Sequence, residues 1–246
     1  MNILYEDTAL VVLDKPAGLT SEEGVPAALR QRWGRPDAYV GVIHRLDTGV
    51  SGLMVYARTP GAAAALTKQV TESQQAYAIL DGRAEAGPGA PAQPCFLKTY
   101  RAVIAGGPDE QLPPEGILRD YLFKDSRKGR VFPVKRPRKG VREAVLEYRI
   151  VKTAGEMSLA EITLHTGRTH QIRVQFASRK HPLYGDGKYG SERQNKRYGR
   201  SYQALYSYRL EFCFTTDAGA LAPLDGQQFQ VEQVDFVTEY FPGFSL

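Results

Sequence analysis

Short apolar runs recur along the whole chain, separated by glycine, proline or charged turn residues, and this pattern limits the possible folds most strongly. Such runs are typical of β-strands rather than helices. They predict strands at 3–5, 10–13, 40–43, 53–57, 97–105, 117–123, 144–152, 157–164, 206–214 and 229–234. Helices are expected only at 27–33, 60–75 and 169–178. Without regular alternation of strand and helix, the pattern predicts an α+β fold around a mixed, largely antiparallel sheet.

Helix signals and breaker residues divide the remaining chain. Thr59-Pro60 is a capping residue followed by a proline suited to the first turn of a helix. The region 76–96 is rich in proline and glycine and is expected to be a loop insertion. No linker long enough to split the chain is apparent, so a single domain over residues 1–246 is expected, with a basic loop region at 124–142.

Composition excludes several classes of protein. Hydrophobic residues make up 42% and charged residues 24%, which excludes bulk disorder. No apolar stretch reaches the ~18 residues of a membrane span, and the acidic start Glu6-Asp7 does not suit a signal peptide. Two cysteines and four histidines lack metal-ligand spacing, so no metal is expected. These features predict a soluble, cytoplasmic protein.

The basic residues are concentrated in two segments. Between Lys124 and Arg142 there are nine lysines and arginines against one acid, Asp125. A second cluster contains Lys188, Arg193, Lys196, Arg197 and Arg200, interleaved with Tyr184, Tyr189, Tyr198 and Tyr202. Basic runs with aromatic residues suit a nucleic acid, whose phosphates attract cations and whose bases stack. The alternative is a pair of solvated surface loops without a partner.

Asp47 is the first candidate for chemistry. It lies in the glycine-bearing loop 44–52 between two expected strands, two positions after Arg45. Loops held by rigid strands commonly present reactive groups, and a nearby guanidinium stabilises an ionised carboxylate. The alternative is an ordinary turn in which Arg45 and Asp47 form a structural ion pair.

A second dense segment extends from Thr166 to Arg173. Thr169 is expected to cap a helix, with Arg168, His170 and Gln171 near its N-terminus, where an anion would be favoured. The cation of Arg173 could pair with a carboxylate from elsewhere in the chain. The alternative is a capped amphipathic helix that carries surface arginines.

Together, these segments closely resemble the RluA-type pseudouridine synthases. The stretch from His44 to Leu53 resembles the HRLDxxTSGL motif, and the stretch from Lys98 to Ala102 resembles KxYxA. The stretch from Gly167 to Val174 resembles GRTHQIRV, and it is followed by Pro182, Gly185-Asp186 and Tyr189-Gly190 as in PxxGDxxYG. The opening segments, Leu4 to Asp7 and Lys15 to Gly18, are also similar, so the resemblance covers nearly the whole chain.

The resemblance implies a pseudouridine synthase fold with a central RNA-binding cleft and the isomerisation of uridine in RNA to pseudouridine, without a cofactor. It implies that Asp47 is the essential carboxylate, Arg173 its salt-bridge partner and Tyr100 the residue that stacks on the uracil. Arg45 would fill the space left by the flipped base or hold phosphate. Substrate contacts are expected from Arg45, Ser51, Gly52, Arg168, His170 and Gln171, and contacts with the RNA backbone from Lys124, Arg130, Lys135, Arg136, Arg138 and Lys139.

Departures from the motifs leave alternatives open. Val50 replaces the usual threonine before Ser51-Gly52, and the link at 76–96 is longer than usual. This link is either a flap that contacts RNA or a tolerated loop insertion. No N-terminal S4-like domain is expected, so the basic segments would supply the affinity for RNA. The main expectation is a monomeric synthase acting on ribosomal or transfer RNA. A non-catalytic RNA-binding protein that retains the scaffold is the alternative, while a glycosidase-like hydrolase lacks an evident second acid.

Overall fold

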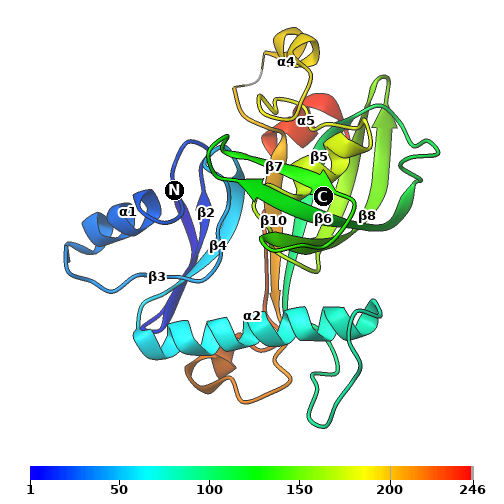
Figure 1. Ribbon diagram of the computed structural model, residues 1–246. Helices are drawn as coiled ribbons and strands as arrows, with labels where there is room; N and C mark the ends of the chain where they lie inside the picture. The colour runs from blue at the N-terminus through cyan, green and yellow to red at the C-terminus, as the bar shows by residue number, and fades with distance from the viewer. Residues whose placement is uncertain (200, 245–246) are drawn as a thin grey trace. The chain divides into compact units, whose positions relative to one another are not determined.

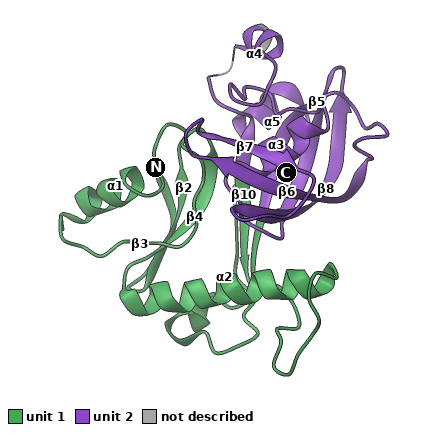
Figure 2. Cartoon of the chain, in the orientation of Figure 1, with its two compact units in different colours: residues 1–98, 207–231 green, residues 99–206, 232–246 purple. Residues whose placement is uncertain are grey.

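The structure, a computed structural model, describes residues 1–199 and 201–244, and it divides into two compact units. Figure 2 shows unit 1, residues 1–98 and 207–231, and unit 2, residues 99–206 and 232–246. Each unit draws on two separate stretches of chain, so the division does not follow a linker. The expected single domain therefore stays a prediction.

Unit 1 is built on a β-sheet (Figure 1). Its strands are β1 (Asn2–Glu6), β2 (Leu10–Lys15), β3 (Gly41–Val42), β4 (Ser51–Ala57), β10 (Leu205–Phe212) and β11 (Gln228–Gln230). Their order is β1-β2-β4-β10, with β3 paired to β4 and β11 paired to β10. The β1–β2, β2–β4, β3–β4 and β10–β11 pairs are antiparallel. Helix α1 (Gly24–Trp33) follows β2, as expected. The strands at 40–43 and 229–234 are shorter than predicted.

The core of unit 1 lies between this sheet and helix α2 (Pro60–Leu80) with the 3-10 helix η1 (Gly219–Leu224). Alternate strand residues such as Leu10 and Val55 are fully buried against Leu66 of α2. Burying one apolar face in this way is the main favourable contribution to folding. Thr59 caps α2 as predicted, because its hydroxyl accepts from the amide of Ala62 at 3.1 Å.

Helix α2 ends at Leu80 rather than at residue 75, which corrects the predicted boundary. Ala76 and Tyr77 are buried, so packing extends the helix until Asp81 and Gly82 end it. The first part of the expected loop insertion is therefore helical, and only the remainder, up to β5 (Phe96–Ala105), is irregular.

Unit 2 contains most of β5 together with four further strands of the same sheet. These are β6 (Glu115–Asp125), β7 (Arg130–Val134), β8 (Val141–Ala154) and β9 (Met157–Leu164), in the order β5-β9-β8-β6-β7. Each of these pairs is antiparallel, which confirms the predicted sheet type. The β8–β9 hairpin turns at Gly155, whose φ of 58° suits glycine.

Three features of unit 2 were not predicted. Strand β7 lies inside the expected basic loop, and its Pro133 is tolerated because β7 is the last strand in the order. Helices α4 (Glu192–Tyr198) and α5 (Asp235–Tyr240) are short. Helix α3 (Gln171–Ser178) begins after His170, so the prediction that Thr169 caps it is wrong.

Candidate active site

The Asp47 loop is fixed through its backbone. The amide of Val50 donates to the carbonyl of Asp47 at 2.9 Å, which closes a tight turn. The amide of Gly18 donates to the carbonyl of Thr48 at 2.8 Å, which joins the loop to the segment after β2. The Ser21 hydroxyl donates to the carbonyl of Leu46 at 2.8 Å and accepts from the amide of Leu46 at 3.1 Å. The half-buried Asp47 is therefore held on both sides.

Lys15 supplies a further anchor, a role that its place in the sequence does not indicate. Its side chain is fully buried, and its ammonium donates to the carbonyls of Pro16 and Leu19 at 2.9 Å and approaches that of Thr48 at 3.4 Å. Burial lowers the pKa of Lys15 to about 8, although attraction to Asp47 and Asp14 opposes the fall. The loop thus has a buried cation beneath it.

His44 and Val50 complete the apolar side of this loop. The His44 ring nitrogen Nε2 accepts from the amide of Val55 at 3.1 Å, and burial lowers the pKa of His44 well below its ordinary value. The imidazole is therefore neutral near pH 7 and acts as an acceptor toward β4. Val50 is 2% exposed, so the residue that departs from the family motif is buried as an apolar side chain.

The remaining predicted residues of unit 1 lie next to Asp47. Arg45 is largely exposed and pairs with the exposed Glu22 at 2.8 Å, so its guanidinium is accessible. Gly52 has a φ of 128°, and a Cβ at that position would come within 2.5 Å of the Ser207 backbone nitrogen on β10. Gly52 is therefore required by close packing of β4 and β10. A substrate contact by Ser51 or Gly52 stays a prediction.

Arg173 lies in unit 2, where its guanidinium forms a two-pronged ion pair with Asp186. Nε donates to Oδ2 at 2.7 Å and Nη2 donates to Oδ1 at 2.8 Å. Burial alone would raise the pKa of Asp186, but the bonds from Arg173 and from the amides of Tyr189 and Lys188 outweigh it and lower that pKa. In the sequence, Asp186 stood out only as part of the Gly185-Asp186 motif, and no other feature indicated that it pairs with Arg173.

The segment before α3 is organised by internal hydrogen bonds. Gln171 is 3% exposed, and its Oε1 accepts from the Thr166 hydroxyl at 2.8 Å and from the Arg168 amide at 3.0 Å. Arg168 donates through Nε to the carbonyl of Glu143 at 2.8 Å. His170 has a φ of 53°, a conformation costly for a residue other than glycine and often found at functional sites. Its Nδ1 lies 2.8 Å from the Tyr189 hydroxyl.

The predicted residues therefore fall into two local groups. Unit 1 holds Arg45, Asp47, Ser51 and Gly52 on one loop, and unit 2 holds Arg168, His170, Gln171 and Arg173 on another. Tyr100 is on β5 in unit 2, 4% exposed and opposite Ile162 of β9. The pairing of Asp47 with Arg173 joins residues of different units and stays a prediction.

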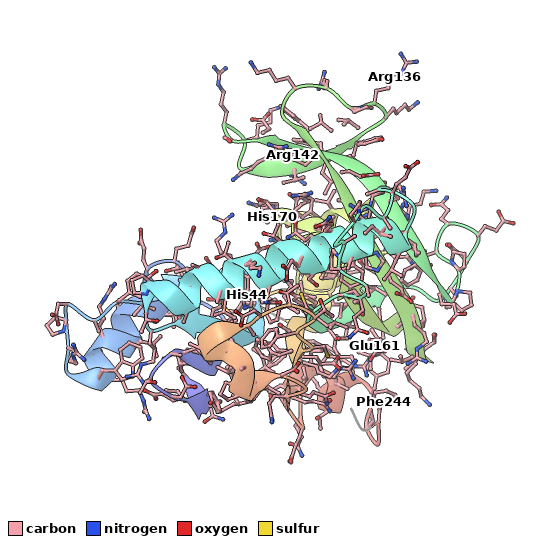
Figure 3. All side chains as sticks on the ribbon, turned by 90° about the horizontal axis from the view of Figure 1, so that it is seen from below. His44, Arg136, Arg142, Glu161, His170 and Phe244 are labelled. Atoms are coloured by element: carbon pink, nitrogen blue, oxygen red, sulfur yellow. The ribbon has the colours of Figure 1, made fainter. Side chains whose placement is uncertain are left out.

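The basic residues expected to contact the RNA backbone are all exposed on the β6–β7–β8 region: Lys124, Arg130, Lys135, Arg136, Arg138 and Lys139. Figure 3 shows Arg136 at the outer end of this region. In the second cluster, however, Tyr184 is 1% exposed and the Tyr189 hydroxyl accepts from the amide of Val131 at 2.8 Å. These two rings are structural. Arg200 and the side chains of Arg197 and Tyr198 lie outside the described residues.

Two general properties concern the described part of the chain alone. Across residues 1–199 and 201–244, no helix combines the length and apolar character needed to cross a bilayer. Within those same ranges, no cluster of three or more His, Cys, Asp or Glu side chains is placed to hold a metal ion.

Known proteins are similar to this chain in sequence, and others are similar to it in fold. Residues 9–178 match the RNA pseudouridylate synthase family. An uncharacterised RNA pseudouridine synthase of Synechocystis is 31% identical over 78% of this chain and 55% of its own length. Ribosomal large subunit pseudouridine synthase D of Zymomonas mobilis is 29% identical over 97% of this chain and 69% of its own length.

The chain spans about half to two thirds of the length of the curated relatives it matches. Human RNA pseudouridylate synthase domain containing 4 has a similar fold, with a TM-score of 0.68 at 20% identity, over 97% of this chain and 91% of that chain. The family match alone extends over more than half of the 246 residues, as the resemblance to RluA-type enzymes predicts. The chain therefore belongs to the RNA pseudouridylate synthase family.

Proposed function

We propose that the protein isomerises specific uridines in structured RNA to pseudouridine, with Asp47 as the essential carboxylate. The observation that carries the proposal is the Asp47 loop, which is held by hydrogen bonds from Gly18, Ser21 and Lys15. A reactive group gains most when its surroundings fix its position before the substrate arrives. Nothing in an ordinary surface turn requires a fully buried lysine beneath it.

The reaction needs no external atoms. The bond between N1 of uracil and C1′ of ribose breaks, the uracil turns over, and its C5 is joined to C1′. The hydrogen on C5 leaves as a proton and N1 takes up a proton, so the product is an isomer of the substrate. In this proposal Asp47 either attacks the ribose or removes a ribose proton, Tyr100 stacks on the uracil, and Arg173 pairs with Asp47. The target base leaves the RNA stack first, which costs a few kcal/mol and favours loops or single strands.

The RNA class is also part of the proposal. Ribosomal RNA and transfer RNA both offer structured loops with accessible uridines, and the name of the Zymomonas mobilis relative favours large-subunit ribosomal RNA. The exposed cations of the β6–β7–β8 region would neutralise phosphates of either RNA. A monomer in the cytoplasm remains the expectation for this chain.

Tritium release tests the activity directly. Ribosomal and transfer RNA transcripts carrying tritium at uridine C5 would be incubated with wild type, Asp47→Asn and the control Asp37→Asn. Asp37 is an exposed acid in another loop of unit 1, so its change should leave turnover intact. We expect release by wild type and by the control, and at least a thousandfold less by Asp47→Asn with RNA binding retained.

The alternative, a binding protein that retains the scaffold, makes a different prediction. It gives tight RNA binding but no release of tritium from any transcript, with or without Asp47. Full activity of Asp47→Asn would instead assign the chemistry to another residue and refute the proposed role of this carboxylate.

A further inference from the structure

The sheet formed by β6, β7 and β8 has two contrasting faces. On one face, Leu122, Val131 and Ala144 are buried against Val174 of α3. Because side chains alternate along a strand, the neighbouring residues point to the opposite face. That outer face carries the aromatic side chains of β6 and β7.

The outer face brings three aromatic side chains together. Phe123 of β6 pairs directly with Phe132 of β7, and Tyr121 is two residues before Phe123 on the same strand. Directly opposite residues on antiparallel strands have side chains within contact range. Phe132 is 37% exposed, and Tyr121 and Phe123 are partly exposed. We call Tyr121, Phe123 and Phe132 the aromatic platform.

Cations lie over two of these rings. The guanidinium carbon of Arg138 is 5.4 Å from the centre of the Phe123 ring, and the Lys128 ammonium is 5.9 Å from that of Phe132. Arg138 and Lys128 belong to the segment from Lys124 to Arg142, with nine basic residues and one acid. A guanidinium over an aromatic ring is itself a flat surface on which a base can stack.

The strands that carry the platform are also held by contacts with the segment around Tyr189. The Val131 amide donates to the Tyr189 hydroxyl at 2.8 Å, and the Lys188 ammonium donates to the carbonyl of Gly129 at 2.7 Å. The Tyr189 hydroxyl in turn lies 2.8 Å from Nδ1 of His170. The guanidinium carbon of Arg173 lies over the Tyr189 ring, 5.2 Å from the centre of that ring. The hairpin that carries the platform is therefore anchored to the segment that contains Arg173.

We propose that the aromatic platform stacks unpaired bases of the RNA that flanks the target uridine, while the surrounding cations bind its phosphates. The charge around the rings favours a polyanion and opposes a second copy of this equally basic face. A duplex keeps its bases stacked inside and cannot use exposed rings, so the inference narrows the substrate to uridines beside single-stranded nucleotides. It rests on the proposed function.

Fluorescence of 2-aminopurine tests stacking with unaltered protein. Oligonucleotides would carry the probe at successive positions beside the target uridine, in a single-stranded and in a fully paired context. We expect quenching at one or more unpaired positions and none in the duplex. Absence of quenching at every position, with binding intact, would overturn the platform.

Variants separate stacking from charge. Phe123→Leu and Phe132→Leu keep apolar volume but remove the ring, and each should weaken single-strand binding about tenfold, with an unchanged salt dependence. Lys135→Gln should do the opposite, keeping the quenching but lowering the slope of log affinity against log salt by about 0.7. Ile117→Ala, at an apolar position that is 52% exposed on the same strand, is the matched control and should change neither quantity.

Three outcomes would refute the platform. Wild-type affinity and quenching in Phe123→Leu/Phe132→Leu, with an unchanged thermal melt, would show that the rings are not used. Equal loss of duplex and single-strand binding would indicate a general effect on the hairpin. If, without RNA, wild type sedimented as a larger species than the double variant, the face would instead be assigned to protein association. Tritium release measured on the same RNAs shows separately whether the proposed function itself fails.

Discussion

Lys15 lies in an environment that departs strongly from that of an ordinary lysine. It is fully buried, its pKa is lowered to about 8 from an ordinary 10.5, and an unfolded chain would restore the ordinary value. Between pH 8 and 10.5, the unfolded chain therefore holds a proton that the folded chain has released. The contribution of Lys15 to the free energy of unfolding consequently rises with pH over this window.

This sign gives a measurable difference between wild type and Lys15→Met. Urea unfolding at several pH values should show the free energy of unfolding of wild type increasing relative to the variant from pH 8 to 10.5, by at most about 3 kcal/mol. A relative decrease over the same window would contradict the buried ammonium. Near pH 7 the variant should turn over more slowly, because the Thr48 carbonyl and Asp47 lose the cation beneath them.

Asp186 offers the opposite case, a buried acid whose pKa is lowered by its cationic partner. Asp186→Asn would leave the buried Arg173 without this counter-charge and should cost about 3–5 kcal/mol of stability. Because the folded pKa lies below the unfolded one, the contribution is complete above about pH 4 and is lost as pH falls further. Denaturant titrations at pH 7 and pH 3 should show the gap between wild type and variant closing; a gap independent of pH would argue against the ion pair.

The sequence indicated the candidate catalytic residues, but it did not indicate the residues that hold them in position. Asp47 and Arg173 stand in recognisable motifs, whereas Lys15 and Ser21 act through backbone carbonyls that only the folded chain brings together. The cap of α3 was misjudged for a similar reason. Thr169 has the right side chain, but the Gln171 side chain bonds the preceding turn and His170 takes the left-handed position instead.

At the scale of elements, the approach of β4 to β10 depends on one missing side chain. Gly52→Ala would place a Cβ against the Ser207 backbone and would strain a φ of 128°, so a loss of about 2–6 kcal/mol is expected. Gly61→Ala, in the first turn of α2 with open space around its Cβ, is the control and should be neutral or slightly stabilising. Thermal unfolding of both variants provides the measurement, and equal melting temperatures would refute the close packing.

The basic segment from Lys124 to Arg142 should supply affinity rather than chemistry. Replacing Arg136 and Lys139 by glutamine removes two exposed cations without touching the aromatic platform or either local group of candidate active-site residues. The slope of log affinity against log salt should become shallower by about 1.4–1.8 for the two changes, with turnover at saturating RNA unchanged. An unaltered slope would show that neither residue contacts phosphate.

Helices and strands were predicted correctly where the apolar pattern was continuous. They were missed or misplaced where basic residues or proline interrupted that pattern, or where only burial in the fold set the boundary. The long strands β8 and β9 and their turn agree with the apolar pattern. Strand β7 escaped notice because basic residues surround it and Pro133 lies within it, yet pairing with β6 makes it a strand. The end of α2 depended on burial of Ala76 and Tyr77, which no local signal reveals.

For the molecule as a whole, Cys95 is a natural probe of opening in unit 1. It is fully buried, burial raises the pKa of its thiol to about 11, and the thiol donates to the Gln69 carbonyl at 3.1 Å. In a Cys213→Ser background, thiol labelling at pH 7.5 should therefore be slow and should accelerate with urea in step with global unfolding. Rapid labelling without denaturant would mean that unit 1 opens locally around α2.

The fold of unit 1 can be completed only late in synthesis of the chain. Residues 207–231 contribute β10 and η1 to its sheet and core, so the first 98 residues leave the ribosome long before their partners exist. Until then the edge of β4 and the apolar face beneath α2 are exposed on a nascent polypeptide. Unpaired strand edges recruit other chains. From this interleaved connectivity we expect newly synthesised protein to benefit from rapid completion of translation or from chaperones, although the mature fold keeps β4 paired.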